Sequence, residues 1–124
     1  MESNINTMTV NGVEYVRADS IKNNAPAKEL DGMPYVVIRS RDSGCHAGYL
    51  AEEKGDTVTL YNSRRLWQWS GAATLSQLAM EGVSKSESKF PMEVDKITIY
   101  SICEKIQATE AAKNSIKKVP VWNA

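Results

Sequence analysis

Three short runs of strand-forming residues, separated by tight-turn signals, constrain the fold of this chain more than any other feature of its sequence. Tyr35–Ile38 is continuously apolar, as expected of a well-buried strand. A second run covers residues 46–52, and Lys54-Gly55-Asp56 turns the chain into a third, alternating run over residues 57–62. Strands this close in sequence pair as antiparallel neighbours, so the pattern predicts a meander that curls into a half-barrel.

Two short helices are expected after the meander. Thr74 can cap the first and Thr109 the second, and a glycine and a proline end them. Between the helices, residues 94–106 form a long extended segment whose isoleucines change face near Tyr100-Ser101, which indicates a bulge or bend. The expected fold class is therefore α+β, with a curled antiparallel sheet (a meander or half-barrel) of about five strands, an N-terminal hairpin and two short helices.

The expected N-terminal hairpin precedes this body. Asn11-Gly12 lies between two short β-prone runs and supplies the two positive-φ residues of a type I′ turn. Residues 22–33 carry Asn, Pro and Gly turn signals typical of a linker. We therefore divide the chain into an N-terminal hairpin and linker, residues 1–33, and a sheet-plus-helix body, residues 34–124, within a single domain overall.

Arginine and tryptophan concentrate in the stretch Tyr61–Gly71, which extends or follows the third run. On an extended strand Arg65, Trp67 and Trp69 share one face. Guanidinium groups match phosphate oxygens and indole faces stack on bases, so this combination suits flat anionic ligands. A core strand that buries its tryptophans and keeps arginines at its rim gives the same pattern, and a lone Trp-x-Trp favours that interpretation.

The candidate ligand-binding residues are the arginines of the central sheet, the two tryptophans of this stretch and two neighbouring polar residues: Arg39, Arg41, Asn62, Arg64, Arg65, Trp67, Trp69 and Ser70. In this interpretation, one arginine from each pair holds phosphate, one tryptophan stacks on a base, and an Asn or Ser side chain reads the base edge. Edge-strand charges that prevent aggregation would explain the arginines equally well.

Composition narrows the classes of partner. The net charge of +0 gives the whole molecule no electrostatic attraction to long nucleic acid or to an anionic membrane. No apolar run approaches the roughly 20 residues that span a bilayer. The two cysteines, far apart in sequence, fit a reducing cytosol, so we expect a cytoplasmic protein.

Neither a catalytic nor a metal-binding pattern is evident. His46 is the single histidine, and on a strand its neighbour Cys45 would point to the opposite face. One histidine and two distant cysteines offer no metal-ligand spacing, and glycine-rich phosphate loops and nucleophile motifs are missing. We therefore expect no catalytic residue, no metal, no cofactor and no enzymatic activity.

Two long runs, Pro34–Leu50 and Tyr61–Val83, resemble a family of small tailed-bacteriophage proteins of unknown function. The likeness covers most of the chain from Asn11 to Trp122. The resemblance implies a phage protein in the host cytoplasm, and small phage proteins of this kind often serve against host defences. By analogy, in its length and expected sheet-plus-helix build, the chain is similar to phage sponges that sequester cyclic nucleotide or cyclic ADP-ribose signals.

The leading hypothesis is a non-enzymatic phage protein that sequesters a small cyclic nucleotide-type immune signal, an anionic ligand held by a homo-oligomer. The alternative is a protein–protein interaction module that inhibits a host protein or acts as a virion accessory, because Trp and Arg are also enriched at interface hot spots. Single-stranded nucleic acid binding would suit the tryptophans but not the neutral charge, and nucleotide hydrolysis is the enzyme alternative.

Overall fold

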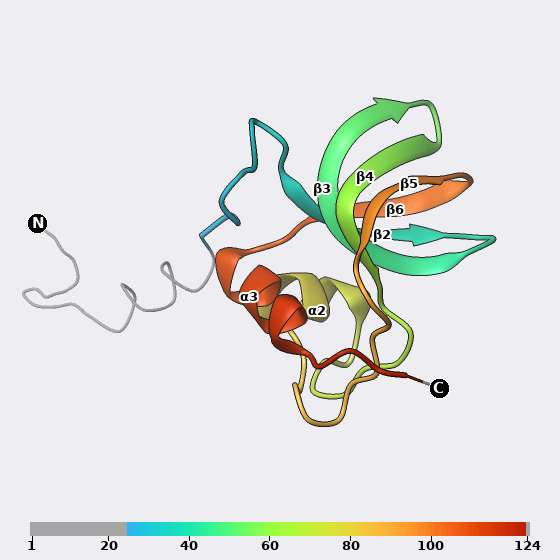
Figure 1. The fold of residues 1–124 in the computed structure, drawn as a ribbon. Coiled ribbons are helices and arrows are strands. Elements are labelled where there is room, and N and C mark those ends of the chain that lie inside the picture. Colours follow the sequence, from blue (N-terminus) through green and yellow to red (C-terminus); the bar gives the residue numbers. More distant parts are fainter. Residues whose placement is uncertain (1–24, 124) are drawn as a thin grey trace, which may run out of the picture.

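A five-stranded antiparallel sheet with two helices forms the described part of the chain, residues 25–123 of a computed structural model (Figure 1). The elements, in chain order, are β2 (Tyr35–Ser40), β3 (Gly44–Lys54), β4 (Thr57–Arg65), α2 (Leu75–Glu81), β5 (Val94–Ile99), β6 (Ile102–Gln107) and α3 (Glu110–Lys118). The expected α+β class with a curled sheet is confirmed. The hairpin expected around Asn11-Gly12 lies outside the described residues.

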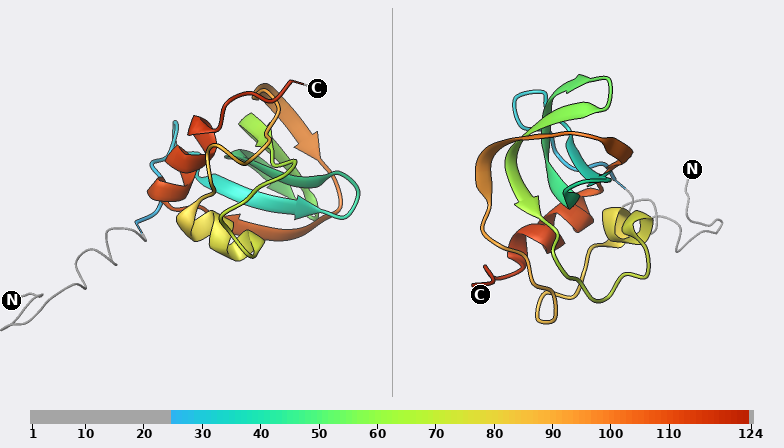
Figure 2. Two further views of the ribbon diagram at one scale, coloured as in Figure 1. Left: turned by 90° about the horizontal axis from the view of Figure 1, so that it is seen from below. Right: turned by 90° about the vertical axis from the view of Figure 1, so that its right-hand side faces the viewer.

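Strands β2 to β5 form an antiparallel meander, and the last strand, β6, pairs with the first strand of that meander, β2. The strand order of the sheet is β5-β4-β3-β2-β6, so the two edge strands are consecutive in sequence. The bend expected between them is confirmed at Ser101, whose φ is 59°. Figures 1 and 2 show that the sheet curls strongly, so that its two edges approach each other at this bend without pairing.

The two faces of the sheet bury separate apolar clusters. On the helix-covered face, Tyr35, Val37 and Tyr49 belong to one cluster with Leu78 of α2 and Ile116 of α3. The opposite face is the inner side of the curl. Its cluster combines side chains from β2, β4 and β5 with Ile102 of β6, and strands at opposite edges can share a cluster only because the sheet curves around it.

Both expected helix caps are confirmed. The Thr74 hydroxyl accepts a hydrogen bond from the Gln77 N–H at 3.1 Å, and the Thr109 hydroxyl accepts one from the Ala112 N–H at 3.0 Å. Each hydroxyl therefore satisfies an N–H that has no partner within its helix. The Thr109 hydroxyl also donates to the Met80 carbonyl at 2.7 Å, which ties the start of α3 to α2.

Residues 25–28, in the described part of the expected linker, contact the body. Ala27 is buried, and its N–H donates to the Ala108 carbonyl at 3.0 Å. The Glu110 N–H donates to the Ala25 carbonyl at 2.9 Å, and the Lys28 N–H donates to the Glu110 carboxylate at 2.7 Å. Residues 25–28 thus hold the beginning of α3.

A bulge in β4 decides which way its arginines point. Tyr61 pairs with Tyr49 and Arg64 pairs with Ala47, so β4 has one residue more than β3 between these pairs. Asn62 lies in this bulge, and its backbone adopts a positive φ of 51° that accommodates the extra residue. Strict alternation would put Tyr61 and Arg64 on opposite faces, whereas the bulge puts both on the helix-covered face.

Candidate functional site

Three tyrosines form a row across the helix-covered face of the sheet. Tyr35 of β2 pairs with Tyr49 of β3, which pairs in turn with Tyr61 of β4. The rings of Tyr35 and Tyr49 meet edge to face, with centroids 5.0 Å apart. The Lys117 ammonium of α3 lies 5.7 and 5.3 Å from these two centroids, a cation–π arrangement that positions the ammonium on the aromatic row.

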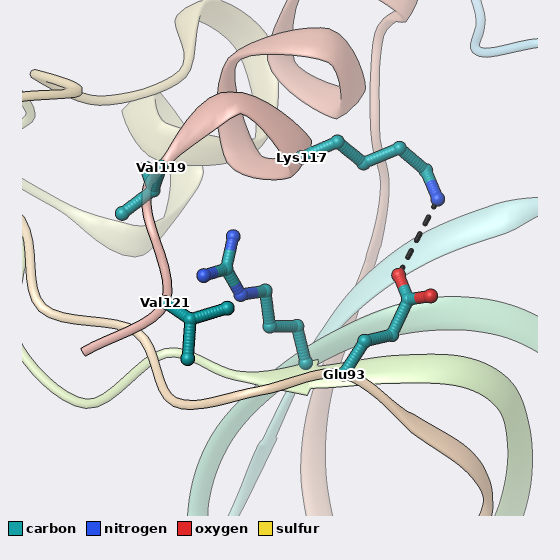
Figure 3. Close-up of a pocket in the computed structure, with 5 residues that line it drawn as sticks. Glu93, Lys117, Val119 and Val121 are labelled. Atoms are coloured by element: carbon teal, nitrogen blue, oxygen red, sulfur yellow. Dashed lines mark hydrogen bonds and ion pairs between the residues drawn. The ribbon is translucent and has the colours of Figure 1, made fainter. Parts of the chain in front are cut away.

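A cavity of about 260 Å³ lies at this ammonium, between the sheet, α3 and the C-terminal tail, which we define as residues 119–123 (Figure 3). Its lining consists of Arg64, Glu93, Lys117, Val119 and Val121. In Figure 3 the side chains of Lys117 and Glu93 point toward each other on one side, and the two valines lie on the other. Two cations against one carboxylate leave the lining with an excess of positive charge.

Arg64 is a buried part of the cavity wall. Its guanidinium donates hydrogen bonds to the carbonyls of Pro91, Ile116 and Phe90, at 2.9, 2.9 and 3.1 Å respectively. Burial lowers the pKa of this guanidinium, and the neighbouring Glu93 carboxylate opposes that shift, so the group keeps its charge. Arg64 therefore contributes positive charge to the cavity, while its nitrogen atoms are engaged with the backbone.

The hydroxyl of Tyr35 is a buried polar group that has no hydrogen-bond partner among residues 25–123. Burial raises the pKa of Tyr35, and the nearby Glu93 carboxylate raises it further, while Arg64 lowers it. The hydroxyl thus lies within electrostatic range of Glu93 and Arg64, two of the three charged groups of the cavity wall. It stays neutral and adds no negative charge to the site.

The predicted arginines do not gather at one place. Arg39 pairs with the Glu104 carboxylate at 2.6 Å on an exposed part of the sheet, and Arg41 is exposed in the β2–β3 turn. Arg65 belongs to the inner face, where its guanidinium donates to the Ser43 carbonyl at 2.8 Å. Of the four arginines, Arg64 is the one that lines the cavity.

The predicted aromatic and polar residues are also separated from the cavity lining. β4 ends at Arg65, so the two tryptophans follow it in irregular structure: Trp67 is 57% exposed, whereas Trp69 packs partly against the helix-side cluster. Asn62 lies in the β4 bulge. The Ser70 hydroxyl donates to the Glu87 carboxylate at 3.2 Å. A ligand-binding role for these residues stays a prediction.

The single histidine, His46, is buried in the sheet and contacts Ser43. His46 is buried on the inner face opposite Ile38, whereas Cys45 pairs with Arg39 on the other face, so the expected separation of this Cys/His pair is confirmed. The His46 Nε2 lies 3.1 Å from the Ser43 hydroxyl and 3.2 Å from the Ser43 carbonyl. Burial, reinforced by Arg65, lowers the pKa of His46 to about 4, so its imidazole is neutral at pH 7.

The sequence patterns did not single out four residues of this site: Tyr35, Tyr49, Glu93 and Lys117. The hairpin register could have paired the two tyrosines, because it follows from the turn between their strands. Lys117 lies in the last turn of α3, where a cation interacts favourably with the helix macrodipole, so its position alone does not indicate a site. No local pattern links Glu93 to Lys117, which meets it only when α3 packs on the sheet.

Two further properties concern the described residues as a whole. Within residues 25–123, no three His, Cys, Asp or Glu side chains come together as a metal site would require. The helices of this part of the chain are too short and too polar to cross a membrane.

The chain belongs to the family described as "Domain of unknown function (DUF6948)", whose match covers residues 33–116. The matched range includes every strand of the sheet and ends inside α3, one residue before Lys117. No curated protein and no solved structure matches the chain.

Proposed function

We propose that this chain is a non-enzymatic binding protein that holds a small anionic, nucleotide-type ligand in the cavity between β4, α3 and the C-terminal tail. The observation that carries the proposal is the excess of positive charge on the cavity lining, with the Lys117 ammonium placed at the cavity by two tyrosine rings. We further propose that it is a phage protein that sequesters a cyclic nucleotide-type immune signal in the host cytoplasm. The resemblance of its sequence to small phage proteins supports this second part.

The chemistry of the lining suits a ligand with one charged and one apolar end. Lys117 offers an ammonium with three donors, and the buried charge of Arg64 adds to the local positive potential. On the other side of the cavity, Val119 and Val121 provide apolar contact for a sugar or a base. These properties favour a phosphate-bearing ligand over a purely apolar one.

The size of the cavity limits what a single chain can enclose. Its volume of about 260 Å³ is close to the lower limit of ordinary small-molecule sites, roughly 300 Å³. A cyclic dinucleotide would extend beyond it, so we propose that such a ligand is shared between the cavities of two chains in a homo-oligomer.

Isothermal titration against cyclic dinucleotides, cyclic trinucleotides and cyclic ADP-ribose isomers tests the proposal. We expect at least one of these ligands to bind and to be recovered intact by chromatography after heat release. Lys117→Met should weaken binding by about fivefold or more, because it removes the ammonium and keeps the apolar stem.

Lys105→Met is the matched control for this substitution. Lys105 is similarly exposed and also pairs with a glutamate, but it lies outside the cavity lining, so its replacement should leave affinity within twofold. Recovery of a hydrolysed ligand would establish an enzyme instead. Absence of heat across the whole panel would contradict the proposal.

A protein–protein module is the second candidate, and one feature of the surface favours it. Trp67, Met92, Val121 and Trp122 are exposed by 57%, 66%, 51% and 36%. They come from three segments that are linked by backbone pairing, Gln68 with Lys89 and Phe90 with Val121. Aromatic and methionine side chains of this kind are enriched at interfaces.

The test for this candidate uses two of these exposed residues. A stoichiometric host protein that co-purifies with the wild-type chain, and is lost with Trp67→Ser and Met92→Ser, would favour an interface. Neither Trp67 nor Met92 lines the cavity. Loss of the partner protein in these two variants would therefore show that the partner binds this surface and not the cavity.

A further inference from the structure

We infer that Glu93 is an internal competitor for the anion site: its carboxylate occupies, in the free protein, the position at Lys117 that the anionic group of a ligand takes in the complex. Glu93 would then determine which ligands are admitted. This inference deepens the proposed function and rests on it for the location of the site.

The Glu93–Lys117 pair is loosely held. Its Nζ–Oε2 distance is 3.5 Å, well beyond the roughly 2.8 Å of a strong charge-assisted hydrogen bond. The Glu53–Lys105 pair has nearly the same exposure, 41% and 37% against 42% and 34%, yet its two atoms lie 2.6 Å apart. The two ion pairs are equally accessible to solvent, but the contact between Glu93 and Lys117 is the weaker one. An incoming anion can therefore replace the Glu93 carboxylate at Lys117.

Lys117 is the donor for which the two anions compete. Three of the five N–H groups of the Arg64 guanidinium donate to backbone carbonyls, so this buried group acts on an anion mainly through its charge. The ammonium of Lys117, by contrast, is held over the rings of Tyr35 and Tyr49. It therefore keeps its position when Glu93 moves away, and the site remains formed.

Glu93 is placed where it can move. It lies in the irregular segment before β5, between Met92 and Val94, which are 66% and 40% exposed. A displaced carboxylate can therefore turn into solvent, and the anion that replaces it takes over its pairing with Lys117 and its charge near the buried Arg64. The carboxylate nevertheless stays tethered near the cavity and repels weak anions.

The consequence is selectivity by charge. A neutral ligand gives Lys117 no substitute for the Glu93 carboxylate, and a single carboxylate only exchanges one equivalent partner for another. A phosphate carries more charge and more acceptor oxygens, so it competes better. The site should therefore prefer phosphate over carboxylate ligands of the same size.

Titration of the full-length ¹⁵N-labelled protein with inorganic phosphate, and in parallel with acetate, tests the inference. Changes in the amide chemical shifts of Lys117, Val119 and their neighbours show that an anion binds in the cavity. Glu93→Gln should strengthen phosphate binding by about 5- to 30-fold, because it removes both the competing carboxylate and its repulsion. It should also reduce the preference for phosphate over acetate.

Glu53→Gln is the matched control, because it makes the same change in net charge at an equally exposed ion pair. It should leave phosphate affinity within twofold. Adding Lys117→Met to Glu93→Gln should abolish the gain. Equal effects of the two glutamine substitutions, or no phosphate-dependent shifts in Glu93→Gln, would overturn the inference. A melting curve of each variant verifies folding.

The experiments distinguish a failure of this inference from a failure of the proposed function. Tight nucleotide binding by the wild-type chain without any gain in Glu93→Gln would overturn the inference alone. The expected phosphate pattern together with no binding across the nucleotide panel would retain Glu93 as the competitor and remove the nucleotide-type ligand.

Discussion

The side chain of Arg64 links three segments of the chain through one guanidinium group. It extends from β4 and donates to Phe90 and Pro91 in the loop before β5 and to Ile116 in α3. Replacing it by methionine would remove all three hydrogen bonds, although the Phe90 carbonyl also accepts from the Trp122 N–H and the Ile116 carbonyl from the Val119 N–H. We expect Arg64→Met to lower the free energy of unfolding by about 3 kcal/mol, measured by urea denaturation.

Arg41→Met is the control at the same scale. Arg41 is exposed in the β2–β3 turn, so its replacement should change the free energy of unfolding by no more than about 0.5 kcal/mol. An Arg64→Met protein as stable as the Arg41→Met protein would show that the three hydrogen bonds contribute little. Because Arg64 holds the cavity wall, ligand experiments should vary Lys117 or Glu93 instead.

At the scale of elements, the contact between α2 and α3 depends on Gly82. This residue ends α2 with a φ of 86°, and a Cβ atom there would overlap the Ser115 side chain of α3. The Ser115 hydroxyl exchanges hydrogen bonds with the N–H and carbonyl of Val83, at 2.9 and 3.0 Å. We expect Gly82→Ala to lower the free energy of unfolding by about 3 kcal/mol or more, because it adds steric overlap to backbone strain.

Gly55→Ala separates these two causes. Gly55 also has a positive φ, 62°, but a Cβ atom there would meet no atom within 4 Å. Gly55→Ala should therefore lower the free energy of unfolding by the cost of backbone strain alone, about 1 kcal/mol, in the same chemical denaturation experiment. If the two alanine variants lose the same stability, the packing of α2 on α3 tolerates the added methyl group.

At the scale of the whole molecule, His46 makes stability depend on pH. Its pKa is about 4 in the folded protein and 6.5 as the ordinary value, so the unfolded chain binds the proton first as pH falls. The stabilisation is complete above pH 6.5 and is lost as pH falls toward 4. We expect His46 to account for about 3 kcal/mol of lost unfolding free energy between pH 7.5 and pH 4.

His46→Gln isolates this contribution from that of the carboxylates. Both proteins are unfolded with urea at several values between pH 7.5 and pH 4, and the difference between their pH dependences belongs to the histidine. Glu110, whose pKa is lowered mainly by the Lys28 N–H, titrates in both proteins and cancels. Identical pH dependences would mean that His46 is accessible to protons in the folded state.

Local sequence determined most of the secondary structure. The turn at Gly55, the caps at Thr74 and Thr109 and the bend at Ser101 were all predictable, because each depends on residues within a few positions of one another. The curled α+β sheet followed from the short spacing of its strands. These features need no knowledge of distant parts of the chain.

The candidate site was decided by tertiary structure. Strict alternation along β4 assigns Arg64 to the inner face, and the bulge at Asn62 reverses that assignment. Glu93 and Lys117 become neighbours only because α3 and the segment before β5 meet over the sheet. Short-range hydrogen bonds, periodicity and short connections thus account for the elements and the curled sheet. The bulge between β3 and β4 and the docking of α3 depend on contacts between elements, which no local pattern encodes, and they alone brought these charges together.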